Sequence, residues 1–537
     1  MKKEYRSALL LLGLLLWIVG LITGLTFSYY KNTPPSSTYT LGGGFLFDYY
    51  QYVSWVKSGI MGNLLLVNRY TEEPHPAAVF NPWFLIAGFM SRPFSLSPFT
   101  AYFLFRLTSA IFFITLVFQL VCAVFPKWPQ RLLSTVLLIT SGSWWWIVNA
   151  NGTRTLREPI EWSRNFNVVE KFLLAPHHYI ALGGLVWILI HVLTRPLTLT
   201  RMALSLLIIT ASAFANPYIV ALFDVFFLIT GIIALLIRKN DRRRVMSAMA
   251  LFILFSLPAI GYHAYLSYTQ YPWTQMFKMT REFNPGVTII EYILALGPIV
   301  IPSLVAIPLG VFTNTRMLFL VVWAFTPIFL FFLSTSVLPM NHQRVFQSYQ
   351  YIPLSLLAAF TIERLAVSLR RIGPNAYKLT LGAFCLTSMI YSSYPIMASI
   401  KRLKEEIKPN YYNAYVPNPA IHAFAFLDTE TDVNSVVLSG EYVSSMIPAF
   451  TQNRVILGRG DASLSYLDKR EQTFAFVDGR MNEEDARRFL KMYGISHIVF
   501  GIDTLEFEGL PNRSFPFLEI VFHEERVTVV RVITELL

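Results

Sequence analysis

Long apolar runs alternate with short polar connections over the first 400 residues. The first run, residues 8–27, is about 20 residues long, which is enough to cross the roughly 30 Å hydrocarbon core of a bilayer. Further runs lie at 98–125, 131–150, 174–194, 201–215, 217–238, 246–267, 286–313, 316–338, 349–369 and 377–399. The pattern predicts a polytopic all-α membrane domain of about 11 transmembrane helices.

Basic residues precede the first apolar run. Lys2, Lys3 and Arg6 come directly before it, and no clear small-residue cleavage site follows it. A secretory signal peptide has a shorter apolar core, of roughly 7–15 residues, and such a cleavage site. We therefore expect this run to stay in the protein as a transmembrane helix with its N-terminus in the cytoplasm.

The remaining basic clusters predict which loops face the cytoplasm. They lie at 127–131, 195–201, 238–244, 316 and 370–378. Cytoplasmic loops carry an excess of Lys and Arg. All of these clusters lie on the cytoplasmic side only if the segment 77–92 does not cross the membrane. We therefore expect 77–92 to form a juxtamembrane helix at the outer interface, where Trp83 and Phe84 suit the headgroup region. The segments expected outside are 28–97, 151–173, 268–285, 339–348 and everything after residue 400.

The chain becomes more polar from residue 401. Strands are predicted at 435–439, 454–457 and 497–500, with a strand or hairpin within 521–533. A helix is predicted over 482–494, because its first turn is acidic and Gly494 can cap its end. This order predicts a small soluble α/β domain. We expect two domains: 1–400, a transmembrane domain with its first external loop at 28–97, and 401–537, an extracytoplasmic α/β domain.

Composition and charge narrow the class of protein. Of the 537 residues, 54% are hydrophobic and only 14% are charged, whereas soluble proteins carry roughly 25% charged residues. This excludes a single large soluble domain, a disordered chain and a nucleic-acid binder. The net charge of +12 is mostly assigned to cytoplasmic loops. Cys122 and Cys385 lie inside apolar runs, so no cysteine-based metal site is expected.

The first external loop contains two candidate site residues. Asp48 follows a glycine-rich apolar stretch and precedes a helical pattern. It is either a helix N-cap or a carboxylate at the membrane surface, acting as a general base or metal ligand. His75, in Glu72-Glu-Pro-His-Pro76, is a metal ligand, a phosphate contact or a solvated loop histidine.

The second external segment is rich in charge. Arg154 and Arg157 are candidates for bidentate contacts with a phosphate. Glu158 or Glu161 would supply a second carboxylate facing Asp48. The alternative is an ordinary solvated loop.

Further polar residues lie at or inside the predicted helices. His177 and His178 open one helix, where they would bind a metal or form interfacial hydrogen bonds, and adjacent positions point in different directions. Arg344 precedes another helix from outside and is either a phosphate ligand or an interfacial arginine. Asp224 lies within a span, where it would pair with Asn216 or His191 or mark a polar cavity.

Several short motifs resemble the GT-C superfamily of membrane glycosyltransferases, including family 39 and the protein O-mannosyltransferases. The matching residues in the first loop are Phe47-Asp48-Tyr49-Tyr50-Gln51-Tyr52 and His75-Pro76. The chain is more similar to uncharacterised bacterial GT-C-like multispan proteins. That likeness rests on Trp162, Pro176-His177, Arg344, Tyr351-Ile-Pro-Leu354 and the tail segments 436–439, 466–469 and 493–501.

The resemblance implies transfer of a hexosyl or pentosyl group from a polyprenyl-phosphate donor to a glycan or protein acceptor. Asp48 would deprotonate the acceptor, with inversion at the anomeric carbon. Arg344, Arg154, Arg157 and His75 would hold the donor phosphate. The reaction would take place at the outer face of the cytoplasmic membrane.

The chain departs from the family pattern at one point. Many members carry two adjacent acids in the first loop, whereas Tyr49 follows Asp48 here. Glu158 or Glu161 would then supply the second acid. A divalent cation, Mg²⁺ or Mn²⁺, is left open as a cofactor, with His177 and His178 as candidate ligands.

Two other functions stay open. One is a transporter or flippase for a lipid-linked glycan, for which Asp224 is the best support, although the charged residues gather at one face rather than at a midplane site. The other is a non-catalytic envelope assembly protein in which the tail is the working part.

Overall fold

The computed structural model forms two compact units. It describes residues 2–42, 46–144, 146–150, 153–157, 175–192, 198–237, 242–282, 286–334, 342–373, 375–405, 414–502 and 515–537. The first unit comprises Met1–Ile22, Arg106–His263 and Arg281–Arg402, and the second comprises Thr23–Phe105, Ala264–Thr280 and Leu403–Leu537. The contacts thus group most of the first loop with the tail, and the domain division at residue 400 stays a prediction.

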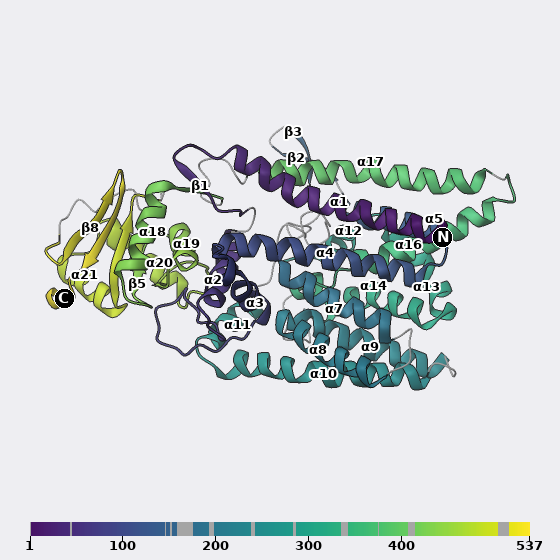
Figure 1. The fold of residues 1–537 in the computed structure, drawn as a ribbon, viewed down its shortest axis with the longest axis horizontal. Helices are drawn as coiled ribbons and strands as arrows, with labels where there is room; N and C mark the ends of the chain where they lie inside the picture. Colours follow the sequence, from purple (N-terminus) through teal and green to yellow (C-terminus); the bar gives the residue numbers. More distant parts are fainter. Residues whose placement is uncertain are drawn as a thin grey trace. The chain divides into compact units, whose positions relative to one another are not determined.

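The first unit is a bundle of apolar helices (Figure 1). Within the described ranges, 6 helices are long and apolar enough to cross a membrane. They are α1 (Lys2–Lys31), α4 (Pro98–Val124), α9 (Pro217–Ile237), α10 (Arg242–Thr269), α14 (Thr315–Ser334) and α16 (Tyr351–Leu369). Helices α12 (Ile289–Ala295) and α13 (Val300–Thr313) form a pair bent by 92°, which makes 7 if the pair is one span. The predicted class, a polytopic helical membrane protein, is confirmed.

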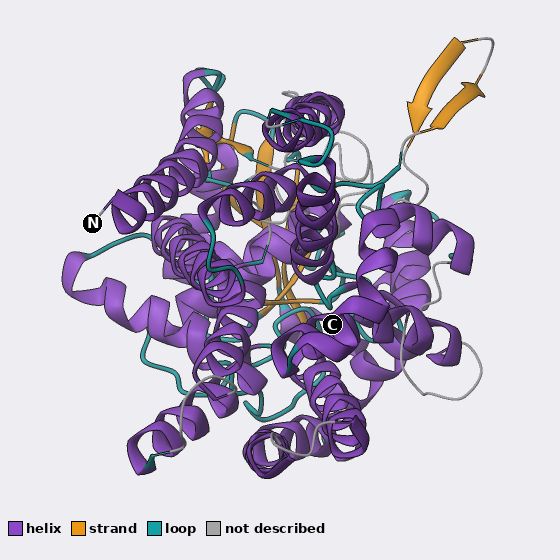
Figure 2. Cartoon of the chain, turned by 90° about the vertical axis from the view of Figure 1, so that its right-hand side faces the viewer, coloured by secondary structure: helices purple, strands orange, loops and turns teal. Residues whose placement is uncertain are grey.

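The other predicted runs also contain helices, but these are shorter or less apolar. They are α5 (Trp128–Thr140), α7 (Pro176–Val192), α8 (Leu199–Ala215) and α17 (Ala376–Glu405). The prediction of one continuous span over 131–150 is wrong in its second half. There β2 (Trp146–Ala150) pairs antiparallel with β3 (Thr153–Arg157), drawn as an orange hairpin in Figure 2. A short apolar run fits a strand as well as a helix, so its hydropathy alone could not separate the two.

Helix α16 is largely enclosed and packs against α5, α13 and α14. Most of its side chains are buried, including the small residues Ser355, Ala358 and Ala359. Ser303 of α13 donates a hydrogen bond to the carbonyl oxygen of Leu354 at 2.8 Å. Small residues and interhelical hydrogen bonds stabilise helix pairs in lipid, where apolar burial gives little driving force.

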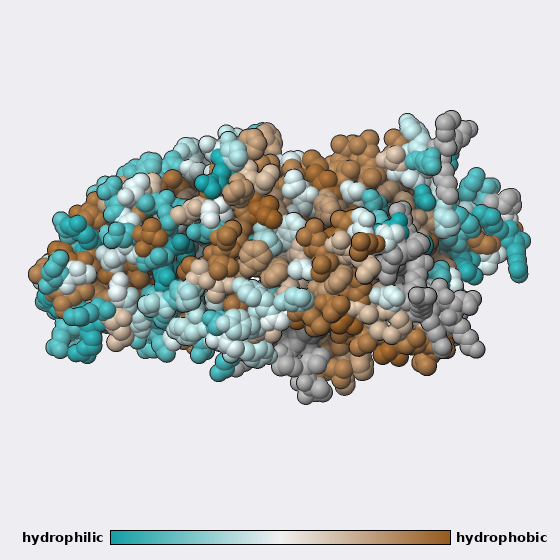
Figure 3. Space-filling view, turned by 60° about the horizontal axis from the view of Figure 1, so that its bottom comes forward, coloured by the Kyte–Doolittle hydropathy of each residue, from teal (hydrophilic) through white to brown (hydrophobic). Residues whose placement is uncertain are grey.

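Large apolar side chains stay exposed on the outer helices of the bundle. Examples are Leu207, Ile232, Leu254, Phe329 and Phe332. Figure 3 shows many hydrophobic residues on the visible face of the molecule. Such a surface is typical of contact with lipid acyl chains.

The first-loop part of the second unit is built on two short helices in close contact. Helix α2 (Leu46–Ile60) crosses α3 (Pro82–Ser91). A Cβ atom added to Gly88 would lie 2.1 Å from the carbonyl oxygen of Val56, and one added to Gly59 would lie 2.4 Å from that of Leu85. Glycine is therefore required at both positions. Helix α3 has 10 residues, so 77–92 contains a helix too short to span, while its place at the membrane interface stays a prediction.

The tail part of the second unit is a layered α/β structure (Figure 1). Its sheet has the order β6 (Arg454–Val455), β5 (Val436–Leu438), β7 (Ile495–Phe500), β9 (Val527–Val532), β8 (Leu518–Glu524). The first three strands are parallel, and β8 and β9 form an antiparallel hairpin. These strands and α21 (Glu483–Met492) confirm the predicted elements.

Alternate strand residues of this sheet face two separate cores. Val437 and Val499 pack with α2, α18 (Asn418–Glu430) and α19 (Glu441–Phe450). Leu438 and Ile498 pack with α20 (Tyr466–Val477) and α21 on the other face. A short strand of the first loop, β1 (Ser37–Tyr39), also pairs antiparallel with β4 (Tyr415–Pro417) of the tail. Loop and tail therefore share one hydrophobic core.

Candidate functional site

Asp48 lies in the first turn of α2 and leaves 39% of its side chain exposed. The helix begins at Leu46, so Asp48 is inside it rather than at the N-cap. A carboxylate in the first turn interacts favourably with the helix dipole. The next two side chains, Tyr49 and Tyr50, are buried in the shared core. This packing fixes the part of the helix from which Asp48 projects.

Arg459 of the tail forms an ion pair with Asp48. The distance from its Nη1 to Oδ1 of Asp48 is 2.9 Å. Its Nε lies 2.5 Å from Oδ1 of Asp461, and Nη2 donates to Oδ2 of the same residue at 3.1 Å. It also donates to Oε1 of Gln51, one turn along α2 from Asp48. One guanidinium therefore joins two carboxylates that come from distant parts of the chain.

Burial and charge act in opposite directions on Arg459. Burial alone would lower its pKa, but Asp461 and Asp48 beside it outweigh that effect and raise the pKa above its ordinary value. The guanidinium is therefore charged at every pH at which the protein is folded.

The loop that carries Arg459 is anchored to the first loop on either side of it. Gly458 lies against the buried ring of Tyr70, where a Cβ atom would approach to 2.7 Å. Asn68 donates to the carbonyl oxygen of Ala462 at 2.8 Å. These contacts place Arg459 beside α2 by holding the backbone before and after it.

A buried ion cluster lies in the same unit. The ammonium group of Lys469 is 2.6 Å from Glu72 and 2.8 Å from Glu73, and its side chain is only 2% exposed. Burial raises the pKa of Glu72, and Lys469 partly opposes this. Arg454 donates to the carbonyl oxygen of Glu73 at 3.0 Å. Glu72 and Glu73, which come shortly before His75 in the first loop, thus hold this loop to the tail.

His75 uses both ring nitrogens within its own loop. Its Nε2 accepts from the backbone N–H of Asn68 at 3.1 Å, and its Nδ1 contacts the carbonyl oxygen of Glu73 at 2.7 Å, which requires a proton on Nδ1. Burial lowers the pKa of His75. This geometry favours a neutral structural histidine over the predicted phosphate contact or metal ligand.

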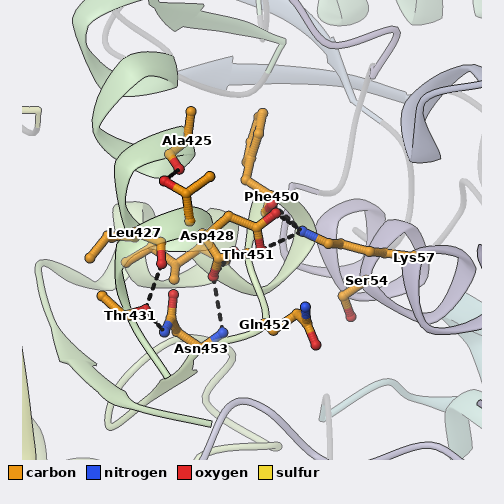
Figure 4. Close-up of polar contacts among 12 residues, drawn as sticks. Ser54, Lys57, Ala425, Leu427, Asp428, Thr431, Phe450, Thr451, Gln452 and Asn453 are labelled. Atoms are coloured by element: carbon orange, nitrogen blue, oxygen red, sulfur yellow. Dashed lines mark hydrogen bonds and ion pairs between the residues drawn. The ribbon is translucent and has the colours of Figure 1, made fainter. Parts of the chain in front are cut away.

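A second ion pair between α2 and the tail lies at the other end of this helix (Figure 4). The ammonium group of Lys57 is 3.0 Å from both carboxylate oxygens of Asp428 in α18. It also donates to the carbonyl oxygen of Phe450, at the end of α19. Lys57 is nine residues from Asp48, which is about 13 Å along a helix.

Arg344 lies in the first unit, in the short helix α15 (His342–Phe346). Its guanidinium carbon lies 4.3 Å from the ring centre of Tyr218, in α9. Its Nε is buried and has no hydrogen-bond partner among the described residues. A stacked guanidinium with an unused donor is suited to binding an anion.

His177 and His178 begin α7 of the same unit. Their rings are 4.4 Å apart in an edge-to-face arrangement, and the ring of His178 lies 6.4 Å from that of Tyr349. His177 is buried, with 7% exposure. No group of three or more His, Cys, Asp or Glu residues that could hold a metal ion is found within the described ranges. The predicted metal-ligand role of both histidines stays a prediction.

The remaining predicted site residues fall in or near the second external segment. Arg154 and Arg157 lie on β3, where the backbone pairs them with Asn149 and Trp146. Glu158 and Glu161 lie outside the described residues. Their predicted roles are untested by the structure.

The predicted partners of Asp224 are wrong. Ser256 of α10, rather than Asn216 or His191, donates to its Oδ2 at 2.8 Å. Asn216 instead accepts from the N–H of Ile219 at 3.2 Å, and His191 contacts the carbonyl oxygen of Trp187 at 3.0 Å. A polar residue on the neighbouring helix was not considered from sequence, because helix pairing is not visible in hydropathy.

Comparison with known proteins identifies the fold. No family model and no curated protein sequence matches the chain. Among solved structures, it is similar to ArnT from Cupriavidus metallidurans bound to undecaprenyl phosphate, with 13% identity, a TM-score of 0.52, and coverage of 96% of this chain and 98% of that one. The chain has a GT-C fold.

Two further solved structures share this fold. The Archaeoglobus fulgidus oligosaccharyltransferase AglB, in complex with an inhibitory peptide and a dolichol-phosphate, has 12% identity and a TM-score of 0.52 over 90% of this chain and 69% of that one. The mycobacterial arabinofuranosyltransferase AftD has 13% identity and a TM-score of 0.51 over 96% of this chain and 40% of that one. These neighbours confirm the GT-C resemblance at the level of fold.

Arg459 and Asp461 were not among the residues predicted from sequence. Gly458-Arg-Gly460 lacks the third glycine and the helix context of a dinucleotide-binding loop, so the sequence indicated a site in this segment only weakly. The available signal was two opposite charges between small residues, directly after a predicted buried strand. Loops at the ends of strands often carry functional side chains, but nothing local indicates that this loop reaches Asp48.

Proposed function

We propose that this GT-C protein is an inverting glycosyltransferase that uses a polyprenyl-phosphate sugar as its donor. The observation that carries this proposal is the similarity to ArnT over almost the full length of both chains, since that structure holds undecaprenyl phosphate. The structures of AglB with a dolichol-phosphate and of the arabinofuranosyltransferase AftD support the same class. A lipid-linked donor also fits a chain whose body is an apolar helix bundle.

Asp48 is the proposed general base. It is partly exposed, charged groups surround it, and α2 is held rigidly by the shared core. A carboxylate can take the proton of an acceptor hydroxyl as that oxygen attacks the anomeric carbon. The bond from this carbon to the phosphate oxygen breaks on the opposite side, so the configuration inverts and polyprenyl phosphate leaves.

Arg344 is the proposed ligand of the donor phosphate. Its stacking on Tyr218 and its unused Nε leave it able to neutralise charge on the leaving phosphate. Arg154 and Arg157 are proposed to assist. A divalent cation remains part of the proposal only as a candidate, with no residue set in the described ranges to hold it.

We place the reaction at the outer face of the cytoplasmic membrane. The N-terminus would be cytoplasmic and the tail extracytoplasmic, as the basic clusters of the sequence favour. The acceptor would be a glycan or a protein of the cell envelope.

The test is sugar transfer in liposomes containing the purified protein. Donors would be undecaprenyl-phosphate hexoses and pentoses, and the acceptor a cell-envelope extract. We expect Asp48→Asn to lower turnover by roughly 10²-fold or more, because the amide cannot accept the proton. Undiminished turnover by this variant would remove Asp48 from the proposed role.

A further inference from the structure

We propose that the tail completes the active site. Arg459 positions Asp48, and Asp461 is the second carboxylate of the site, which positions Arg459. This inference rests on the proposed function, because it assigns roles around the same Asp48. The second acid of the site is then Asp461, whereas the sequence suggested Glu158 or Glu161.

Asp461 restricts the orientation of the Arg459 side chain. Two of its nitrogens, Nε and Nη2, lie at 2.5 Å and 3.1 Å from the two oxygens of Asp461. One hydrogen bond and one close charge contact with the same carboxylate restrict the orientation of the planar guanidinium. The remaining nitrogen, Nη1, then points at Oδ1 of Asp48 and at Gln51.

The backbone that carries these two residues is also held in place. The N–H groups of Ala462 and Ser463 both donate to the carbonyl oxygen of Arg459, at 2.9 Å and 2.8 Å. Gly458 fits against Tyr70 and leaves no space for a side chain. The loop is therefore a tight turn, and its backbone helps to fix the position of Arg459.

The three side chains are partly exposed. Asp48, Arg459 and Asp461 leave 39%, 23% and 30% of their side chains exposed. The Lys469–Glu72 pair, which also joins the first loop to the tail, is far more buried, at 2% and 10%. Asp48, Arg459 and Asp461 are thus open enough for a substrate hydroxyl to reach Asp48. The guanidinium of Arg459 meanwhile holds in place the Asp48 carboxylate, which receives the proton of that hydroxyl.

The consequence is a catalytic carboxylate whose orientation depends on a domain far away in sequence. Positioning matters because a displacement of about 1 Å at a reacting group can cost roughly 10²-fold in rate. A sugar transferase of this kind would be inactive without its tail even if every membrane helix were folded.

The test measures kcat and KM of Arg459→Ala, Arg459→Lys and Asp461→Asn in the liposome assay, with the undecaprenyl-phosphate sugar that supports wild-type turnover. We expect kcat to fall by about 10²-fold for Arg459→Ala and about 10-fold for Asp461→Asn, with the donor KM within about 3-fold. Added guanidinium at millimolar concentration should restore part of the turnover of Arg459→Ala and none of that of Asp48→Asn.

The matched control is Lys57→Met, which removes the other loop–tail ion pair of α2. It should lower the melting temperature at least as much as Asp461→Asn does and leave kcat unchanged. If Arg459→Ala and Asp461→Asn turn over within about 3-fold of wild type, the inference fails.

Two further outcomes separate this inference from the proposed function. If Asp48→Asn is fully active, the proposed function loses its base whatever Arg459 does. A different result is an inactive Asp48→Asn together with a fully active Asp461→Asn. If Glu158→Gln or Glu161→Gln is then inactive, the second acid comes from the second external segment, and the positioning role of Asp461 is overturned.

Discussion

At the scale of residues, several ion pairs of the second unit join the first loop to the tail. Arg459 reaches Asp48, Lys469 reaches Glu72 and Lys57 reaches Asp428. The Lys469–Glu72 pair has little exposure and is therefore costly to break, because removing one partner leaves an uncompensated charge. The sequence identified Asp48, but its partners could not be predicted, since hundreds of residues separate them along the chain.

His75 predicts a pH dependence of stability. Burial lowers its pKa in the folded protein, while Glu73, Arg454 and Arg69 add smaller effects of both signs. The unfolded chain therefore binds the proton more readily, so this stabilisation is complete above the unfolded pKa of about 6.5 and is lost as the pH falls through the folded pKa.

We therefore expect the melting temperature of the wild type to fall more between pH 7 and pH 5 than that of His75→Gln. The measurement is thermal unfolding of the full-length protein in detergent, followed by tryptophan fluorescence. Equal pH dependence of the two proteins would show that His75 is not held neutral.

At the scale of elements, hydropathy predicted the presence of helices better than the residues at which they end. Each predicted apolar run contains a helix, and the predicted strands of the tail are present. Helices α18, α19 and α20 were not predicted. In the structure α18 and α19 pack between the tail sheet and α2, and α20 packs on the other face of the sheet, so their formation depends on contacts with residues far away in the sequence.

The crossing of α2 and α3 gives a sharp prediction for Gly88. A methyl group there would lie 2.1 Å from the carbonyl oxygen of Val56, which is backbone and cannot rotate away. We expect Gly88→Ala to destabilise the protein by about 1–3 kcal/mol or more, as overpacking does.

The matched control is Gly382→Ala in α17. No atom lies within 4 Å of the position that a Cβ would take at Gly382, and alanine favours a helix over glycine by about 0.5–1 kcal/mol. The melting temperatures of both variants give the comparison. A Gly88→Ala protein as stable as the control would mean that the two helices are not packed this closely.

At the scale of the whole molecule, composition and topology predicted the fold class but not the site. The apolar runs and the basic clusters were sufficient for a polytopic membrane protein, and the short loop motifs were sufficient for the GT-C resemblance that the solved structures bear out. The grouping of the first loop with the tail was not predictable, because a sheet pairing such as Thr38 with Val416 leaves no periodic signal in the sequence.

The central claim is that the protein transfers the sugar of a lipid donor and does not move that lipid across the membrane. The most direct measurement uses vesicles containing the wild-type protein and undecaprenyl phosphate carrying an isotopically labelled sugar, with envelope extract outside. Mass spectrometry would follow the lipid, and a membrane-impermeant reagent would report its leaflet. The account predicts that free undecaprenyl phosphate accumulates in step with labelled acceptor. Intact sugar-lipid that has only changed leaflet would contradict it.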